Sequence, residues 1–240
     1  MLTKEMMGIL SASKGIGWVV EPEAKRLLSL AGLDVPRFIW AARTEEAVRF
    51  AREIGFPVVG KVVSPRVIHK SDRDGVVIGI DTDKKLIEAF GRFSRVEEFA
   101  GMLVEEMVEG VELIVGAKVD DQFGPVILLG MGGTGVEIYR DVVLRMAPLT
   151  ERDIESMWKC LKAHPILEGY RGSKPINLKE LAKLLMTFSN LVMDLEKFIQ
   201  SIDLNPVICS SERCVVADAR IMLADCERNR NSNFQIPNSK

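Results

Sequence analysis

The sequence predicts an α+β fold in which neighbouring strands pair with each other between helices. Helix and strand signals alternate along the 240 residues, but the strands come in adjacent pairs. That order argues against a doubly wound parallel sheet, in which strands and helices take turns one by one. Apolar residues make up 47% of the chain and charged residues 28%, as in an ordinary globular protein. A chain of this length can bury one large core or two small ones, and we expect a boundary near residue 100.

The charge balance excludes some classes of partner. The chain has 32 basic and 34 acidic side chains, a net charge of −2, with both signs interspersed. This balance argues against a nucleic-acid or polybasic membrane binder. No window approaches the roughly 18 apolar residues of a membrane span, and Lys4 and Glu5 interrupt the start that a signal peptide would need. We therefore expect a soluble cytoplasmic protein.

Three helices and three strands are expected before residue 100. Pro22 suits the first turn of a helix that stops before Gly32, and Thr44 is a candidate N-cap. A polar segment at 64–75 separates two strands. The expected helices are 22–31, 44–54 and 84–93, and the expected strands are 38–41, 57–63 and 76–80.

The second half begins with strands and also ends with them. In the strand expected at 111–119, Val111 and alternate residues after it form one apolar face, and Glu112, Ile114, Gly116 and Lys118 form the other. Thr150 and Asn177 are the predicted N-caps of two helices. The other expected strands are 102–108, 126–129, 202–209 and 214–221, with a turn at 210–213. As domains we expect an N-terminal extension at 1–20, modules at 21–100 and 101–224, and a polar tail at 225–240.

The cysteines do not predict a metal site. Cys160, Cys209, Cys214 and Cys226 lack the two-residue spacing of a zinc knuckle, and the chain has only two histidines. Cys209 and Cys214 flank the predicted turn, so they could face each other. A cytosolic compartment would keep them as thiols.

Lys61 and His69 are the first candidates for chemistry. A lysine inside an apolar strand is costly to bury unless it is paired or contacts an anion; alternatively, an edge lysine can extend its ammonium to water. His69 lies among polar neighbours, Arg66 and Lys70 included. It is either a solvated loop histidine or a base or nucleophile that titrates near neutral pH.

A glycine-dense segment at 130–135 follows a predicted strand. Its backbone N–H groups could bind phosphate, although the spacing fits neither a Walker A loop nor a G-x-G-x-x-G turn. Gly132 and Gly133 lie inside it, and Asp141 and Arg145 follow shortly after.

The C-terminal hairpin offers two oxygen ligands for a hard cation. Strand alternation can place Asn205 and Asp218 side by side on one face. Mg²⁺ typically takes one or two protein carboxylates and completes its shell with phosphate oxygens and water. The alternative is an Asx turn at Asn205 and a surface aspartate.

Short segments in order over residues 21 to about 223 resemble the ATP-grasp (β) subunit of ADP-forming acetyl-CoA synthetases. The longest reads PVVGKVVSPRVIHKSD and starts at Pro57. The others are 21–25, 112–116, 122–125, 130–133, 141–148, 171–172, 203–206 and 217–220. Two positions depart from the family pattern: Asp74 stands before Gly75 where the family has a second glycine, and Ser201 stands where it has a glutamate.

The resemblance implies an ATP-grasp fold, in which two α+β subdomains clamp a nucleotide. It implies that Lys61 contacts the nucleotide phosphates and that Asn205 and Asp218 ligate the Mg²⁺ of ATP or ADP. His69 matches a phosphohistidine that carries phosphate from a partner subunit to ADP. The other residues assigned to the nucleotide are Glu105, Glu106, Met107 and Val108, whose backbone would read adenine, Glu112 near the ribose, and Gly132, Gly133 and Arg145.

The resemblance also implies an acid–thiol ligase that needs a partner. The overall reaction would be acyl-CoA, ADP and phosphate to free acid, CoA and ATP, and the reverse. The chain has no evident CoA-binding module, so an α subunit would carry the CoA-binding and phosphohistidine domains, in an α2β2 heterotetramer. Two alternatives remain open: another ATP-grasp carboxylate ligase, in which His69 is incidental, and a non-catalytic nucleotide-binding or scaffold subunit.

Overall fold

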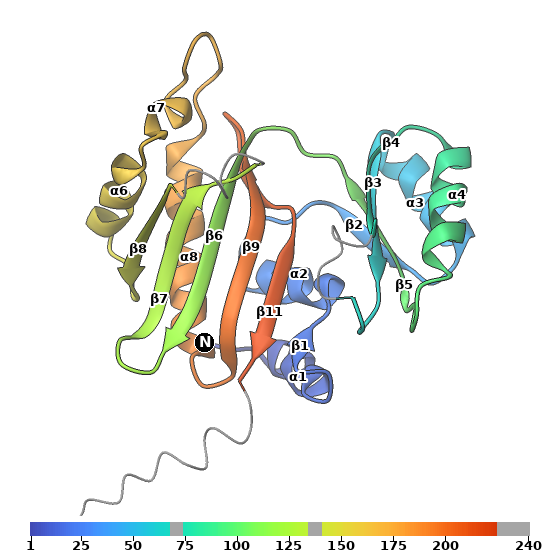
Figure 1. Cartoon of the computed structure of the whole chain (residues 1–240), viewed down its shortest axis with the longest axis horizontal. Helices are drawn as coiled ribbons and strands as arrows, with labels where there is room; N and C mark the ends of the chain where they lie inside the picture. Colours follow the sequence, from blue (N-terminus) through green and yellow to red (C-terminus); the bar gives the residue numbers. More distant parts are fainter. Residues whose placement is uncertain (68–73, 134–140, 225–240) are drawn as a thin grey trace, which may run out of the picture.

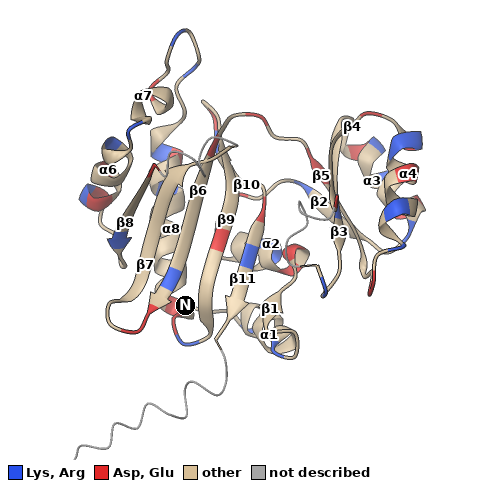
Figure 2. Ribbon diagram, viewed as in Figure 1, with Lys and Arg blue, Asp and Glu red and all other residues tan. Residues whose placement is uncertain are grey.

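A computed structural model describes residues 1–67, 74–133 and 141–224, which form two lobes (Figure 1). The small lobe, residues 38–106, contains a four-stranded sheet, and the other described residues form the large lobe around a seven-stranded sheet. Charged side chains of both signs lie on both lobes (Figure 2). In the described part of the chain, no helix is long and apolar enough to cross a membrane.

The small lobe has helices on one side of an antiparallel sheet. Its strand order is β2-β5-β3-β4, and Ala47, Ala51, Leu86 and Phe90 of its helices share one core with the strands. In chain order, the elements are β2 (Phe38–Ala41), α3 (Thr44–Ile54), β3 (Val58–Val63), β4 (Val76–Ile80), α4 (Asp83–Phe93) and β5 (Gly101–Glu106).

The large lobe begins at the N-terminus and resumes after β5. Its first elements are α1 (Lys4–Ser13), β1 (Trp18–Val19) and α2 (Glu21–Leu30), followed by β6 (Val111–Asp120), β7 (Gly124–Met131) and β8 (Val142–Met146). After these come α6 (Glu151–Cys160), α7 (His164–Leu167), α8 (Leu178–Leu195), β9 (Ile199–Cys209), β10 (Cys214–Val216) and β11 (Ala219–Leu223). The strand order is β1-β11-β9-β6-β7-β8, with β10 paired to β9.

One face of the large sheet is covered and the other is open. Leu113, Val115 and Ala117 of β6 are buried in one core with α8 residues such as Phe188, whereas Glu112 and Lys118 are exposed. The predicted alternation of β6 is therefore confirmed. The uncovered side carries Glu112, Gly116 and Lys118.

The lobes divide the chain differently from the expected modules. β5 pairs with both β2 and β3, so the small lobe ends after Glu106 and not near residue 100. α2 packs in the core of the large lobe through Ala24, Leu27 and Leu28, although 21–100 was expected to be one module. Both differences arise from long-range pairing, which local periodicity does not encode.

Other elements were missed or shifted. The helix α1, the strands β1 and β8 and the short helix α7 were not expected. Thr44 is the first residue of α3 and Arg43 its N-cap, whereas Thr150 and Asn177 cap α6 and α8 as predicted. The tail expected at 225–240 lies outside the described residues.

Candidate functional site

Lys61 lies in a buried charge cluster between the two lobes. Its Nζ is 2.9 Å from Oε1 of Glu21 and 2.7 Å from Oε1 of Glu105. Lys25 Nζ contacts the same two carboxylates, at 3.2 Å from Glu21 Oε1 and in a closer ion pair with Glu105. These four side chains, the charge cluster from here on, are no more than 5% exposed. Lys61 is thus paired inside the protein, and its ammonium does not extend to water.

Lys61 also reaches the C-terminal hairpin of the large lobe. Its Nζ donates a hydrogen bond of 2.6 Å to the carbonyl of Ala217, the residue before Asp218. Burial would lower the pKa of Lys61, but the carboxylates of Glu105, Glu21 and Asp218 outweigh it and hold the pKa well above its usual range. The structure therefore brings Lys61 and Asp218, expected to act on the same ligand, into electrostatic contact.

Asn205 and Asp218 come together as the hairpin register requires. Leu204 pairs with Ala219 and Val207 with Val216, so one register runs through the hairpin and leaves Asn205 across from Asp218. Asn205 is exposed and Asp218 half-buried. An amide oxygen beside a carboxylate is a donor set that suits Mg²⁺ bound together with phosphate. In the described part of the chain, no three His, Cys, Asp or Glu side chains gather as a metal cage made by protein alone would require.

The linker residues 105–108 connect the lobes at the edge of this site. The side chain of Glu105 is committed to the charge cluster, and Glu106 accepts a 2.7 Å hydrogen bond from Arg213 in the β9–β10 turn. Met107 is 36% exposed and Val108 half-buried. With both glutamates paired, contacts from this linker to a ligand would come from its backbone or from Met107.

Glu112, Gly132 and Gly133 meet at the ends of β6 and β7. The Gly132 N–H donates to the carbonyl of Glu112 at 2.7 Å, and a Cβ at Gly132 would lie within 2.8 Å of Glu112. A Cβ at Gly133 would lie 3.6 Å from the Glu112 carboxylate. This close approach explains why glycine is needed at Gly132. It places the three predicted residues in one group.

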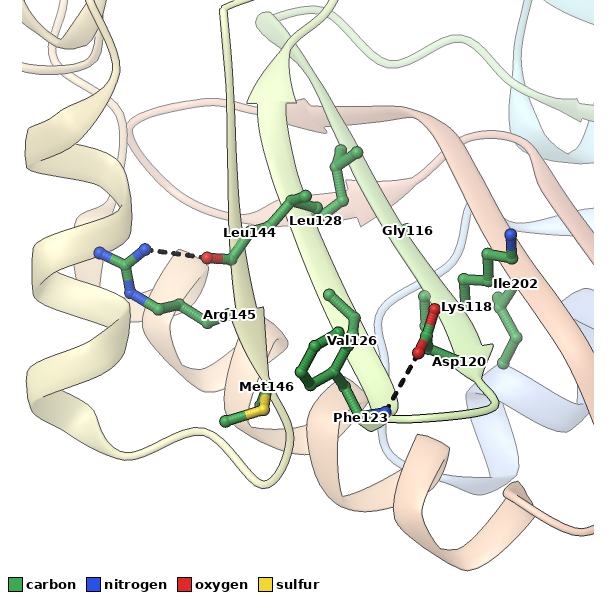
Figure 3. A pocket seen from close by; sticks show the side chains of 11 residues that line it. Gly116, Lys118, Asp120, Phe123, Val126, Leu128, Leu144, Arg145, Met146 and Ile202 are labelled. Atoms are coloured by element: carbon green, nitrogen blue, oxygen red, sulfur yellow. Dashed lines mark hydrogen bonds between the residues drawn. The ribbon is translucent and has the colours of Figure 1, made fainter.

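Arg145 is not brought to the other predicted residues. Its guanidinium donates to Ser156 Oγ on α6 and to the carbonyl of Leu144, both at 2.8 Å, and it points away from Lys118 (Figure 3). It borders a cavity of about 570 Å³ across β6–β8, where Phe123, Leu144 and Met146 are exposed. The cavity lining is otherwise Gly116, Ala117, Lys118, Asp120, Val126, Leu128 and Ile202. A nucleotide contact by Arg145 stays a prediction.

His69 lies outside the described residues, but the residues that flank its segment are described. Lys61 pairs with Val76, and the Val62 N–H donates to the carbonyl of Gly75 at 2.9 Å. β3 thus ends two residues after Lys61, at Val63, and β4 begins opposite Lys61, at Val76. Asp74, one of the departures from the family pattern, has a φ of +50°, in the left-handed region that favours glycine.

Glu21 and Lys25 belong to the buried cluster although no role is predicted for them from the sequence. Both are buried on α2, next to the apolar Ala24, Leu27 and Leu28. An acidic and a basic residue four positions apart on the buried side of an amphipathic helix were the available signal, because such charges are rarely buried unpaired.

Two cysteines face each other across the hairpin, as the position of the predicted turn allows. Cys209 and Cys214 are register partners, and both are buried free thiols. A hydrogen bond to Cys214, together with burial, raises the pKa of the Cys209 thiol. The Cys209 thiol therefore stays protonated and is a poor nucleophile.

Comparisons with known proteins agree with this geometry. A family model described as an ATP-grasp domain matches residues 11–223. The β subunit of ADP-forming acetate–CoA ligase I from Pyrococcus furiosus is 43% identical over 213 residues, 85% of this chain and 91% of that subunit. ADP-forming acetate–CoA ligase I from Archaeoglobus fulgidus is 41% identical over 217 residues, 87% of this chain but 31% of that longer protein.

A solved structure shows the same fold. It is acetyl-CoA synthetase 1 of Ca. Korarchaeum cryptofilum, described with coenzyme A, Mg-AMPPCP and a phosphohistidine segment pointing towards the nucleotide binding site. The TM-score is 0.80 at 39% sequence identity, covering 91% of this chain and 100% of that chain.

The chain belongs to the ATP-grasp family, and the α+β ATP-grasp fold expected from its sequence is confirmed. Among its relatives are the β subunits of ADP-forming acetate–CoA ligases, the group whose motifs the sequence resembles.

Proposed function

We propose that the chain is the nucleotide-binding subunit of an ADP-forming acyl-CoA synthetase, an acid–thiol ligase. The observation that carries the proposal is the hydrogen bond from Lys61 to the Ala217 carbonyl. It joins the buried ammonium of Lys61, in the small lobe, to the residue before Asp218 in the large lobe, and the hairpin register sets Asn205 across from Asp218. Phosphate groups between the lobes would then meet an ammonium on one side and two oxygen ligands for a cation on the other.

Each residue has a distinct role in this proposal. Lys61 binds and orients the nucleotide phosphates, and Asn205 and Asp218 hold Mg²⁺. When bound, Mg²⁺ offsets charge on the transferring phosphoryl group. The backbone of 105–108 and the groups around Glu112, Gly132 and Gly133 border the rest of the nucleotide. His69, in the connection between β3 and β4, accepts a phosphoryl group and passes it to ADP.

We also propose a partner chain that supplies CoA binding and forms the acyl phosphate. Two kinds of relative support this idea. One is a separate β subunit of nearly the length matched here, and the other contains the same unit as 31% of a longer chain. We propose a cytoplasmic complex with two copies of each chain.

The test is reconstitution with candidate partner chains, followed by an assay of ATP formation from acetyl-CoA, ADP and phosphate. His69→Asn should abolish ATP formation and acid-labile phosphate labelling of this chain, while Mg-ADP binding survives. His164→Asn is the matched control, because His164 is the chain's second histidine and its ring Nδ1 lies 2.9 Å from the Leu161 carbonyl in the large lobe. It should leave ATP formation unchanged.

Two other outcomes decide between the remaining candidates. Full activity in His69→Asn would exclude the relay and favour an ATP-grasp ligase that activates a carboxylate directly. Mg-ADP binding without ATP formation in the presence of any partner chain would favour a scaffold subunit. The departures from the family pattern at Asp74 and Ser201 are the reason to consider that alternative.

A further inference from the structure

The charge cluster joins the two lobes. Glu21 and Lys25 are on α2 in the large lobe, whereas Lys61 and Glu105 are on β3 and β5 in the small lobe. Glu21 Oε1 contacts both lysines, at 3.2 Å from Lys25 and 2.9 Å from Lys61. Glu105 also contacts both, one lysine at each carboxylate oxygen. The two lysines therefore share the same two acceptors.

The net charge of this cluster depends on Lys25. Two carboxylates and two ammonium groups sum to zero. Without Lys25, Lys61 alone would face Glu21 and Glu105, with Asp218 also acting on it. A buried cluster of net charge −1 repels an anion, and water screens buried charges poorly. Lys61 would still be present, but the site around it would be negative.

We infer that Lys25 and Glu21 are positioning residues that set the charge presented to the nucleotide phosphates: Lys25 offsets one of the two carboxylates that Lys61 also contacts, so that the cluster is not net negative where the phosphates bind. The inference rests on the proposed function, because it assigns these residues to the same phosphate site. Neither residue needs to touch the nucleotide, since both act through Lys61.

Substitutions within this one cluster should change Mg-ADP affinity in different directions, according to the net charge that they leave. Lys25→Met makes the cluster net −1, Glu21→Gln makes it net +1, and the double variant is neutral again. Mg-ADP affinity, measured by isothermal titration calorimetry on the full chain, should follow this order. One buried unit charge near a phosphate should shift the dissociation constant by roughly tenfold or more.

Three results are therefore expected. Lys25→Met binds Mg-ADP more weakly than the unaltered chain, Glu21→Gln binds it more tightly, and the double variant lies close to the unaltered chain. Adenosine, which has no phosphate, should bind Lys25→Met and the unaltered chain alike in saturation-transfer NMR. Lys159→Met and Glu155→Gln are the matched controls, since this pair has the same four-residue spacing on α6 but is more than half exposed. Both controls should leave Mg-ADP affinity unchanged.

A purely structural cluster would behave differently. It would weaken Mg-ADP binding in Glu21→Gln as much as in Lys25→Met, and that result would overturn the inference. If Lys25→Met does not fold, the double variant is compared with Glu21→Gln and should bind more weakly; equal affinity there also refutes the charge role. Failure of the unaltered chain to bind Mg-ADP would instead refute the proposed function.

Discussion

Lys61 is buried where a strand of this kind normally holds an aliphatic side chain, so the protein loses the hydration of an ammonium group there. Buried ion pairs often add little stability over a well-packed apolar replacement, whereas removal of one partner costs about 3–5 kcal/mol. Stability alone therefore does not explain the four charges. Because they lie next to the hairpin that carries Asp218, we attribute the burial of these four charges to ligand binding.

Lys61→Met should reduce both stability and nucleotide affinity. One ammonium then remains for two buried carboxylates, so we expect a loss of about 3–5 kcal/mol in the free energy of unfolding, measured in urea. Mg-ADP affinity should fall more than roughly tenfold. Adding Glu105→Gln restores the charge balance and should recover part of the stability but not the affinity. Lys85→Met, at an exposed pair with Asp81, is the control and should change neither quantity. Unaltered affinity in Lys61→Met would remove the phosphate role.

Asp218→Asn should act on the metal more than on the fold. The substitution keeps size and hydrogen-bonding capacity but removes the carboxylate charge that Mg²⁺ prefers. We expect the Mg²⁺ concentration for half-maximal binding of a fluorescent ADP analogue to rise roughly tenfold or more. Asp81→Asn, at an exposed site in the small lobe, should not change it. The same Mg²⁺ dependence in both variants would show that Asp218 is not a ligand.

At the scale of elements, the approach of the end of β7 to β6 depends on one glycine. A Cβ at Gly132, the residue after β7, would lie 2.7 Å from the Glu112 backbone carbon. Glu112 is held in β6 by its pairing with β9, and the Gly132 N–H donates to its carbonyl at 2.7 Å, so neither backbone can easily move away. Gly132→Ala should therefore destabilise the protein by about 1–3 kcal/mol, the usual range for overpacking. Gly91→Ala is the control with the opposite sign. Gly91 lies inside α4 with nothing near its Cβ position, so alanine should stabilise the helix by about 0.5–1 kcal/mol. Thermal unfolding monitored by circular dichroism measures the stability of both variants. A Gly132→Ala variant as stable as the unaltered chain would contradict the close approach.

Elements with strong local signals were predictable from the sequence. The alternation of β6 and the N-caps Thr150 and Asn177 lie within a few residues of the structure they specify. β8 was not predicted because apolar residues, among them Leu144 and Met146, lie on its exposed side, so the strand lacks the alternation of apolar and polar residues that indicates a half-buried strand.

The site residues also differ in how far they could be predicted from local sequence. Asn205 and Asp218 meet through a local hairpin, so alternation found them.

The charge cluster was beyond local prediction. Glu21 and Lys61 are 40 residues apart, and Lys25 and Glu105 are 80 apart. Their contacts exist only because α2 packs in the large lobe while β5 pairs in the small one. Neither placement follows from periodicity. The motif resemblance placed Lys61 at the nucleotide but did not say which groups hold it there.

For the whole molecule, side-chain hydrogen bonds outside the charge cluster also join the described parts of the two lobes. Trp18 donates to the Pro65 carbonyl at 3.3 Å, and Arg213 to Glu106 at 2.7 Å. A ligand bound between the lobes would add contacts to both. It would therefore tie together two bodies, each of which has its own apolar core.

Mg-ADP should accordingly protect both lobes from amide hydrogen exchange. At 100 times its dissociation constant, a ligand that binds only the folded state adds about 2.7 kcal/mol of stability. We expect slower exchange in β3 of the small lobe and also in β9 and β11 of the large lobe, because these strands carry Lys61, Asn205 and the residues that follow Asp218. The Lys61→Met variant, at the same nucleotide concentration, should lose the protection of both lobes together. Protection confined to one lobe would mean that the nucleotide does not bridge Lys61 and Asp218, and the site between the lobes would have to be abandoned.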